Sequence, residues 1–203
     1  AALKKTFIKF INNIPFYGVA ICFIDHPEVK KLISKIKDRR VITYGYSSEA
    51  DIQITNLEYK KNKAHFQIYK KQNEEYFKFK LPMYGDHNVA NATAAITVAF
   101  HLKIPLENIK KGLENFKGVK RRFTKVYTWN GIDIIDDYAH HPVEISAVLS
   151  AARKYTSGRV IVVHQPHRYS RLSNLMMDFS KCFDEADIVG ITPIYGAGEN
   201  PIK

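Results

Sequence analysis

The sequence has few cysteines and no long apolar run, and these two absences exclude broad classes of protein. Cys22 and Cys182 are its only cysteines, too few for the disulfide framework of a small secreted domain, so a reducing cytoplasmic location is expected. No apolar stretch approaches the roughly eighteen residues that a membrane span needs. The chain begins at Ala1 without a methionine, signal peptide or transit pattern, so we expect a piece of a longer cytoplasmic protein.

Two common nucleotide-binding motifs are also absent. A Walker A loop needs a glycine, a second glycine five positions later, and then Lys and Ser or Thr, and no two of the ten glycines have this spacing. The only Gly-x-Gly pair is Gly196 and Gly198, and Pro201 stands where the dinucleotide fingerprint needs its third glycine. A nucleotide site within these residues would therefore need a different construction.

What the chain has in excess is positive charge, with 31 Lys and Arg against 20 Asp and Glu. Residues 1–120 hold 21 basic and 11 acidic residues, whereas residues 121–203 hold 10 and 9. The first part is basic through scattered lysines, which predicts a solvated surface. A basic nucleic-acid-binding module is the alternative, and it would need basic residues interleaved with aromatic ones and a steep salt dependence of binding.

The periodicity predicts an α/β fold. Residues 18–24 form an apolar run typical of a strand buried on both faces, followed by a helix at 26–36 and a strand at 41–44. A helix at 3–13 precedes them, three antiparallel strands are predicted within 50–81, and helices follow at 87–102, with Asp86 as N-cap, and at 106–116, ended by a hinge-like Gly118.

Beyond Gly118 a second α/β unit is predicted. Strands at 123–129 and 132–135 flank Asn130-Gly131, a strong hairpin signal. A helix at 143–154, a strand at 160–163, a helix at 172–183 and a strand at 188–191 complete the pattern.

Three strands of this second unit run directly into polar, ionisable segments. These segments are Asp136–Pro142, His164–Arg171 and Thr192–Glu199. Because ligands bind at the carboxyl ends of the strands in open α/β sheets, we expect the three segments to converge on one rim.

The chemistry of this rim suits an anion. Arg168 and Arg171 are three residues apart at a strand-to-helix junction, so they should face the same way and bind a carboxylate or phosphate. His140, His141 and His167 could donate protons or hydrogen bonds near neutral pH. A metal site at His140 and His141 is the less favoured alternative, because adjacent side chains diverge.

The first unit has a smaller cluster at the start of the helix at 87–102. Asn88 and Asn91 are three residues apart, and paired amides can offer a donor and an acceptor to a heterocyclic base. The alternative is simple capping of the helix, which is the more usual role of Asn in this position.

Five motifs in order resemble the Mur ligases of peptidoglycan synthesis. They are HNVANATAA at 87–95, GVKRRF at 118–123, DDYAHHPVEI at 136–145, HQPHRYSR at 164–171 and YGAGENPI at 195–202, and PFYGVAICFIDHPEVKKL at 15–32 with TYG at 43–45 fits the same family. The resemblance implies that residues 1–118 are the later portion of a central ATP-binding α/β domain. It also implies that residues 119–203 are the first portion of a C-terminal, dinucleotide-binding-like domain for the amino acid.

The resemblance further implies an ATP-dependent ligase, and the motifs favour the member that adds the first amino acid. ATP phosphorylates the carboxylate of UDP-N-acetylmuramate, and the amine of L-alanine attacks the acyl phosphate. Within the family's pattern, His87, Asn88 and Asn91 match the residues that hold adenine, Arg122 matches the arginine that reaches the ribose and phosphates across the domain junction, and Asp137 matches the acidic residue on the ribose. Tyr138 and His140 match groups near the incoming alanine and the reacting centre, and His167, Arg168 and Arg171 match the set that receives its carboxylate.

The family's UDP-binding domain, P-loop and magnesium ligands have no match in these 203 residues and are expected upstream. The isolated chain is therefore expected to have no ligase activity and at most weak nucleotide binding. A sibling ligase that reattaches recycled murein peptide shares the DD-aromatic-AHHP motif and stays open as an alternative, as does a non-catalytic, ligase-like scaffold. The oligomeric state and the preference among Ala, Ser and Gly are also left open.

Overall fold

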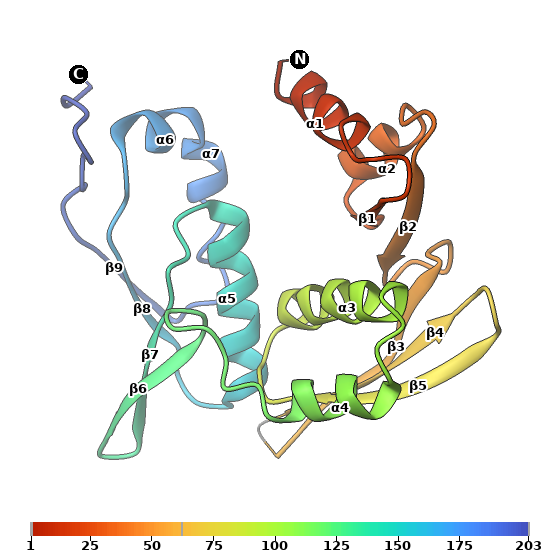
Figure 1. Ribbon diagram of the computed structural model, residues 1–203. Coiled ribbons are helices and arrows are strands. Elements are labelled where there is room, and N and C mark those ends of the chain that lie inside the picture. Colours follow the sequence, from red (N-terminus) through yellow and green to blue (C-terminus); the bar gives the residue numbers. More distant parts are fainter. Residues whose placement is uncertain (1, 62, 203) are drawn as a thin grey trace. The chain divides into compact units, whose positions relative to one another are not determined.

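The computed structural model describes residues 2–61 and 63–202, and its chain divides into two compact units (Figure 1). Unit 1 contains Ala1–Pro82 and His87–Phe116, and unit 2 contains Met83–Asp86 and Lys117–Lys203. Both units combine helices with parallel strand pairs, which confirms the predicted α/β class. A domain boundary between residues 118 and 119 stays a prediction.

Unit 1 is built on a five-stranded sheet in the order β1 (Val19–Phe23), β2 (Arg40–Gly45), β3 (Ile52–Lys60), β4 (Lys63–Lys70) and β5 (Glu75–Leu81). β1, β2 and the start of β3 are parallel, and α2 (Pro27–Ile33) joins the first two strands. β3, β4 and β5 are antiparallel to one another. The strand–helix–strand unit and its antiparallel extension are therefore both confirmed.

The core of unit 1 follows from the alternation of apolar residues along β3 to β5. Side chains at every second position are buried, namely Ile52, Ile54, Phe66, Ile68, Phe79 and Leu81. The helix α3 (Asp86–His101) packs on these strands, and the ring of its Phe100 lies 5.2 Å from that of Phe77. β1 differs from its prediction, because only Ala20 and Cys22 are buried and the other three residues are partly exposed.

The remaining helices of unit 1 are α1 (Ala2–Asn12) and α4 (Leu106–Glu114). α4 ends earlier than predicted, at an Asn115 cap, and Gly118 lies beyond it at a φ of +80°, where a side chain would be strained. The prediction that Gly118 ends α4 was wrong, because the Asn115 N–H already bonds to carbonyl oxygens in the last turn of α4.

Asp86 is the first residue of α3, and its carboxylate accepts hydrogen bonds from Lys154 Nζ at 2.7 and 2.8 Å.

The first strands of unit 2 form the predicted hairpin of β6 (Thr124–Trp129) and β7 (Ile132–Asp136). Asn130 and Gly131 both have positive φ, 47° and 81°, as a type I′ turn requires. α5 (Pro142–Tyr155) follows, and β8 (Ile161–His164) then pairs in parallel with β9 (Ile188–Ile191). Ile145, Leu149, Val160, Phe179 and Cys182 form the buried core of this unit.

Two predictions for unit 2 need correction. The single helix predicted at 172–183 is two short helices, α6 (Tyr169–Asn174) and α7 (Met176–Phe179), with a break at Leu175. The break accompanies the burial of Phe179 in the core, so tertiary packing overrides the helical pattern. Among the described residues β7 pairs only with β6, so the three strands expected side by side do not form one sheet.

Residues 83–86 belong to unit 2 through an aromatic cluster and an ion pair. The ring of Tyr84 lies 5.1 Å from that of Tyr155 and 6.4 Å from that of Phe123. Lys154 binds Asp86 in the same region. A short segment before α3 is thus part of the structure that carries β6, β7 and α5.

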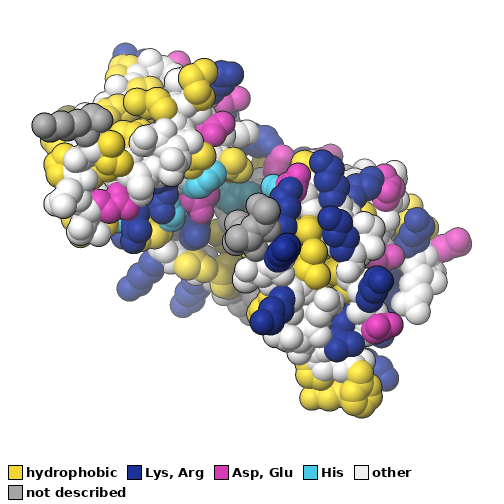
Figure 2. Space-filling model, turned by 90° about the horizontal axis from the view of Figure 1, so that it is seen from above, with side chains coloured by type: hydrophobic (Ala, Val, Ile, Leu, Met, Phe, Trp, Pro, Cys, Tyr) yellow, Lys and Arg dark blue, Asp and Glu magenta, His cyan; other side chains and the backbone are white. Residues whose placement is uncertain are grey.

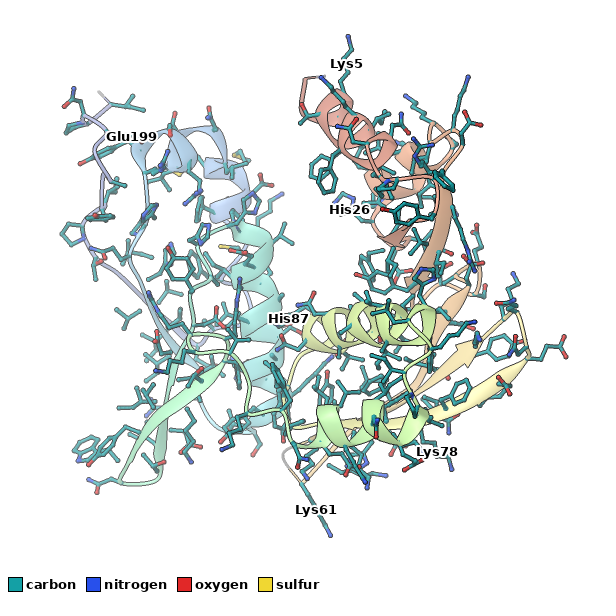
Figure 3. All side chains as sticks on the ribbon, viewed as in Figure 1. Lys5, His26, Lys61, Lys78, His87 and Glu199 are labelled. Atoms are coloured by element: carbon teal, nitrogen blue, oxygen red, sulfur yellow. The ribbon has the colours of Figure 1, made fainter. Side chains whose placement is uncertain are left out.

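The excess of lysine is a surface property, as predicted. Lys5 and Lys61 point away from the body of unit 1, and Lys78 lies on the exposed side of β5 (Figure 3). In Figure 2 the basic side chains stand among acidic and uncharged ones and form no continuous stripe on the face shown. Several lysines also have exposed carboxylate partners, such as Glu49 for Lys30 and Glu114 for Lys80.

Candidate active site

The first segment of the site leads from β7 into α5. His140 Nδ1 lies 3.0 Å from the carbonyl oxygen of Tyr138, which can only accept, so Nδ1 carries the proton and Nε2 holds the lone pair in neutral His140. The Glu144 carboxylate accepts from the backbone N–H groups of His140 and His141. Pro142 occupies the first turn of α5, so the two histidines are fixed at the start of this helix.

The charge state of Glu144 follows from its surroundings. Burial raises the pKa of this carboxyl, but the N–H groups of His140 and His141 and the charges of His140 and Arg122 together hold the pKa below its usual value. Glu144 is therefore an anion beside His140, with 3.6 Å between its Oε2 and Nδ1. It stabilises a positive charge that His140 acquires by accepting a proton at Nε2.

The second segment follows β8 and enters α6. Arg171 Nη1 donates to the carbonyl oxygen of His167 at 3.2 Å and lies 3.4 Å from its Nδ1. Because an arginine can only donate, this contact favours the His167 tautomer with the proton on Nε2. At Nε2, neutral His140 therefore has a lone pair that can accept a hydrogen bond, whereas His167 has an N–H that can donate one.

Arg168 has a different environment from Arg171. Its backbone has a φ of +72°, in the region that disfavours side chains, and its N–H donates to the carbonyl oxygen of Tyr195 at 2.9 Å. Arg168 Nη1 lies 3.7 Å from Glu199 Oε1, and its side chain is half exposed. The two arginines contact different groups, Arg171 the His167 residue and Arg168 the Glu199 carboxylate. That both side chains face the same way stays a prediction.

The third segment follows β9. Tyr195 forms an isolated parallel bridge with His167, and the two rings lie 5.3 Å apart. Glu199 lies on this loop beside α6 (Figure 3) and accepts from the Ser170 N–H at 3.0 Å and the Ser170 hydroxyl at 2.7 Å. These hydrogen bonds, with the charge of Arg168, lower the pKa of the Glu199 carboxyl.

The three segments meet, although β7 is not in the same sheet as β8 and β9. The rings of His140 and His167 lie 6.2 Å apart, and His167 is also the ring next to Tyr195. Tyr138 adds an edge-on contact with His140 at 5.3 Å. The structure therefore brings together Tyr138, His140, His167 and Tyr195 within unit 2, and Arg168 follows His167 directly in the chain.

Asp137 and Arg122 lie at the entrance to the first segment. The two carboxylate oxygens of Asp137 accept from the N–H groups of Phe123 and Ala139, each at 2.7 Å, so this carboxylate joins the residue before β6 to the loop after β7. Arg122 has an exposed side chain and stands close enough to lower the pKa of Glu144. Its neighbour Arg121 stacks on the ring of Tyr138 at 4.5 Å, a cation–π contact.

His164 is the last residue of β8 and is buried. The residue is 7% exposed, its ring packs beside Phe179 and Phe183, and its Nε2 atom has no hydrogen-bond partner among the described residues. Burial lowers the pKa of His164, and the nearby charge of His140 lowers it further. Both effects favour the neutral form of His164, whose ring packs against the core of unit 2.

The predicted adenine residues lie in unit 1, on the first turns of α3. His87 stands at the start of this helix (Figure 3), Asn88 is buried, and Asn91 is exposed. Of the two amides only that of Asn91 reaches the surface freely. Asn88 thus contributes to the packing of α3, and Asn91 is the amide that a base could approach.

Sequence reasoning missed three residues of this site. Glu199 and Tyr195 lie in the YGAGENPI segment, whose position after β9 was noticed without assigning its side chains. Arg121 stands beside Arg122 in the RRF motif, and only the contact with Tyr138 shows which arginine meets that ring. A carboxylate in a Gly-rich loop after a strand was the available signal for Glu199.

Two further features bear on ligands. A hollow of about 360 Å³ in unit 1 is lined by Arg40, Lys70, Lys71, Phe100, His101 and neighbouring residues, at the opposite end of α3 from His87, Asn88 and Asn91, and it contains no predicted site residue. Within residues 2–61 and 63–202 no group of three or more His, Cys, Asp or Glu side chains could hold a metal ion. Among the same residues no helix is long and apolar enough to span a membrane.

Two family models match the chain in sequence, the Mur ligase middle domain at residues 1–99 and the Mur ligase glutamate ligase domain at residues 121–203. Together they leave only residues 100–120 unmatched, and they fall on the two units in the family's order. The chain belongs to the Mur ligase family. The resemblance predicted from the five motifs is thus confirmed.

Curated relatives within the Mur ligase family are similar along the whole chain. The UDP-N-acetylmuramate–L-alanine ligase of Ruegeria pomeroyi is 56% identical over 202 residues, which are 99% of this chain and 43% of that protein. The same ligase of Bartonella henselae is 54% identical over 207 residues, with 100% and 44% covered. The chain therefore spans less than half the length of these relatives.

Solved Mur ligase structures share the fold. The UDP-N-acetylmuramate–alanine ligase of Thermotoga maritima is 29% identical, with a TM-score of 0.72 over 89% of this chain and 39% of that one. A MurF from Acinetobacter baumannii has a TM-score of 0.77 at 24% identity, over 94% and 42% of the two chains. At that identity the second likeness concerns the fold alone.

Proposed function

We propose that these residues belong to an ATP-dependent ligase that joins L-alanine to the carboxylate of UDP-N-acetylmuramate in peptidoglycan synthesis. Membership of the Mur ligase family and the 56% identity to an L-alanine ligase support this assignment. The observation that carries it is the meeting of three segments of unit 2, through the ring contacts of His140 with His167 and of His167 with Tyr195 and the ion pair of Arg168 with Glu199. This cluster offers groups for both ends of an α-amino acid.

The carboxylate end of the amino acid suits the two arginines. Arg168 is half exposed and holds one carboxylate weakly, at 3.7 Å, so donors of its guanidinium stay available to a second anion. Arg171 is bound to His167 and keeps that ring in the tautomer with an Nε2 proton. His167 therefore adds a hydrogen-bond donor to the same anion.

The amine end suits His140. An ammonium group must lose a proton before its nitrogen can attack, and the Nε2 lone pair of His140 is a proton acceptor fixed by the Nδ1 contact with Tyr138. In the proposed reaction ATP transfers its terminal phosphoryl group to the muramate carboxylate and leaves as ADP. The amine nitrogen then bonds to the acyl carbon, the carbon–oxygen bond to phosphate breaks, and inorganic phosphate departs as the amide forms.

Nucleotide contacts are proposed for two groups, each within its own unit. In unit 1 the exposed amide of Asn91, with His87 and the buried Asn88 on the same helix, would recognise the adenine. In unit 2 the exposed Arg122 would meet phosphate or ribose. Asp137 already accepts two backbone hydrogen bonds, so it would meet a ribose hydroxyl only with its remaining lone pairs.

Magnesium is expected with ATP, but the described residues do not supply its site. Mg²⁺ prefers carboxylate oxygens in octahedral geometry, and no suitable cluster occurs within residues 2–61 and 63–202. We therefore assign no residue of this chain to the metal and route no step through it. The isolated 203-residue chain, which has no Walker A motif, is proposed to be inactive by itself.

The biological setting is part of the same proposal. Peptidoglycan is a component of the bacterial cell wall. The ligase would therefore act in cell-wall synthesis and, through it, in cell shape, the cell cycle and cell division. The reduced, buried thiols of Cys22 and Cys182 are consistent with a cytoplasmic location. Small-molecule substrates are proposed, and neither a nucleic acid nor a membrane is assigned as a partner.

The test is the substrate dependence of ADP release by the full-length protein that contains these residues. We expect turnover only when ATP, L-alanine and UDP-N-acetylmuramate are all present, with glycine and L-serine as comparison substrates. Turnover with a murein peptide in place of L-alanine would assign the protein to the sibling activity. Loss of alanine dependence would overturn the proposal.

A further inference from the structure

Glu199 binds the first turn of α6 from the loop after β9. Its two carboxylate oxygens accept from the backbone N–H and the hydroxyl of Ser170, at 3.0 and 2.7 Å. The same carboxylate lies 3.7 Å from Arg168 Nη1, two residues earlier in the chain. One side chain therefore binds both the backbone after Arg168 and the guanidinium of Arg168 itself.

The backbone of Arg168 needs such support. Its φ of +72° is strained for a residue with a side chain, and such a conformation persists only where surrounding contacts fix it. One contact is the hydrogen bond from the Arg168 N–H to the Tyr195 carbonyl oxygen. The other is the hold of Glu199 on Ser170, so the Tyr195–Glu199 loop fixes both sides of Arg168.

The loop itself is closely fitted to α6. A Cβ added at Gly196 would lie 2.9 Å from the Glu199 carbonyl oxygen and 3.0 Å from the Tyr169 ring. The Glu199 N–H also donates to the Gly196 carbonyl oxygen at 3.0 Å, which closes the loop on itself. Glu199 therefore reaches Ser170 from a loop with little freedom to shift.

We propose that Glu199 is a positioning residue that aims Arg168 at the carboxylate of the amino-acid substrate. The proposal rests on the proposed function of the same site. Glu199 is not assigned any contact with the substrate. It neutralises part of the Arg168 charge on one side and leaves the remaining guanidinium donors turned to the incoming carboxylate.

A positioning role predicts a specific kinetic signature. In Glu199→Gln the amide can still bond Ser170, but the charge that holds Arg168 is lost, so the KM for L-alanine should rise by about tenfold. The kcat at saturating L-alanine and the KM for ATP should stay within about twofold of wild type. Ser170→Ala removes one of the two oxygen contacts and should raise the same KM by about threefold.

The control is Glu185→Gln in the same unit. Glu185 is an exposed carboxylate 4.0 Å from Arg153, so the variant removes a comparable surface pair outside the site. Its kinetic constants should match the wild type. Thermal unfolding of every variant separates a change of position from a loss of fold, and Ser170→Ala serves if Glu199→Gln does not fold.

The experiment uses the full-length protein, with ADP release measured against L-alanine and against ATP. A selective rise of the KM for L-alanine in Glu199→Gln and Ser170→Ala supports the proposal. An unchanged KM, or an equal loss for ATP and L-alanine, overturns it while the proposed function stands. A wild-type protein without L-alanine dependence overturns the proposed function, and the role of Glu199 with it.

Discussion

In unit 1 the positive charge is carried by exposed lysines, whereas in unit 2 a few arginines are bound to specific acceptors. Lys61 and Lys78 point to solvent, but Arg171 bonds His167 and Arg168 meets Glu199. The candidate residues of unit 1 also lie on one helix, while those of unit 2 come from three segments joined by side-chain contacts. The net charge of a unit therefore says little about where a binding site lies. The hydrogen-bond and ion-pair partners of each basic side chain are more informative.

The largest expected effect tests whether unit 2 alone holds the proton acceptor. His140→Asn places an amide nitrogen where Nδ1 stood, so the contact with the Tyr138 carbonyl can remain while Nε2 is lost. We expect kcat/KM for L-alanine in the full-length protein to fall by roughly a hundredfold, the usual scale of general base catalysis. Steady-state ADP release measures it.

The matched control for His140→Asn lies in unit 1. Lys78→Gln with Lys80→Gln removes two exposed charges, one of them 3.5 Å from Glu114, without touching a predicted site residue. This double variant should keep wild-type kinetics. Equal losses in the two variants would break the contrast between the units.

A smaller effect concerns stability and compares Asp137 with Asn91. Asp137→Ala leaves the N–H groups of Phe123 and Ala139 without their acceptor, which should lower the free energy of unfolding by about 2 kcal/mol. Asn91→Ala changes an exposed helical position and should alter it by less than about 0.5 kcal/mol. Urea unfolding followed by circular dichroism checks both, and equal values would show that Asp137 is not structural.

The smallest expected effect is a pH dependence within unit 2. Hydrogen bonds from Lys125, Tyr155 and Thr128 lower the pKa of Asp133 from 3.8 to about 2, and the contact with Asp133 raises the pKa of Tyr155 from 10.0 to about 12. The contribution of Asp133 is present above pH 3.8 and is lost as the pH falls toward 2. That of Tyr155 is full below pH 10 and is lost as the pH rises toward 12.

Asp133→Asn should remove both pH-dependent contributions. The difference in unfolding midpoint between wild type and variant is therefore expected to be constant through the neutral range and to shrink at each extreme. Because the Asp133 carboxylate is only partly buried, the difference should be modest. A difference that does not change with pH would show that the contact between Asp133 and Tyr155 is absent in solution.

The sequence was most informative where structure depends on neighbours along the chain. Asn130 and Gly131 predicted their turn because both positions need positive φ, which these residues tolerate. The alternation of β3 to β5 predicted which residues are buried, because a strand turns successive side chains to opposite faces. The motifs also led to the expectation that the segments of His140 and His167 converge, and the two rings lie 6.2 Å apart.

Prediction failed where distant contacts decide the outcome. The helix expected at 172–183 breaks at Leu175, and Phe179 lies in a core formed with residues about thirty positions earlier. Glu199 was overlooked because its role depends on Ser170, which lies about thirty residues earlier in the first turn of α6. The positive φ of Arg168 could not be foreseen either, since nothing in its local sequence favours that conformation.

Unit 2 is assembled from two stretches of chain that a ribosome makes at different times. Met83–Asp86 is synthesised before α3 and α4, yet its partners Phe123, Lys154 and Tyr155 come only afterwards. Folding during synthesis therefore cannot complete unit 2 from its later stretch alone. A truncated protein that begins at Lys117 would lack the Tyr84 ring and the Asp86 carboxylate. Part of its aromatic cluster would then be exposed to solvent.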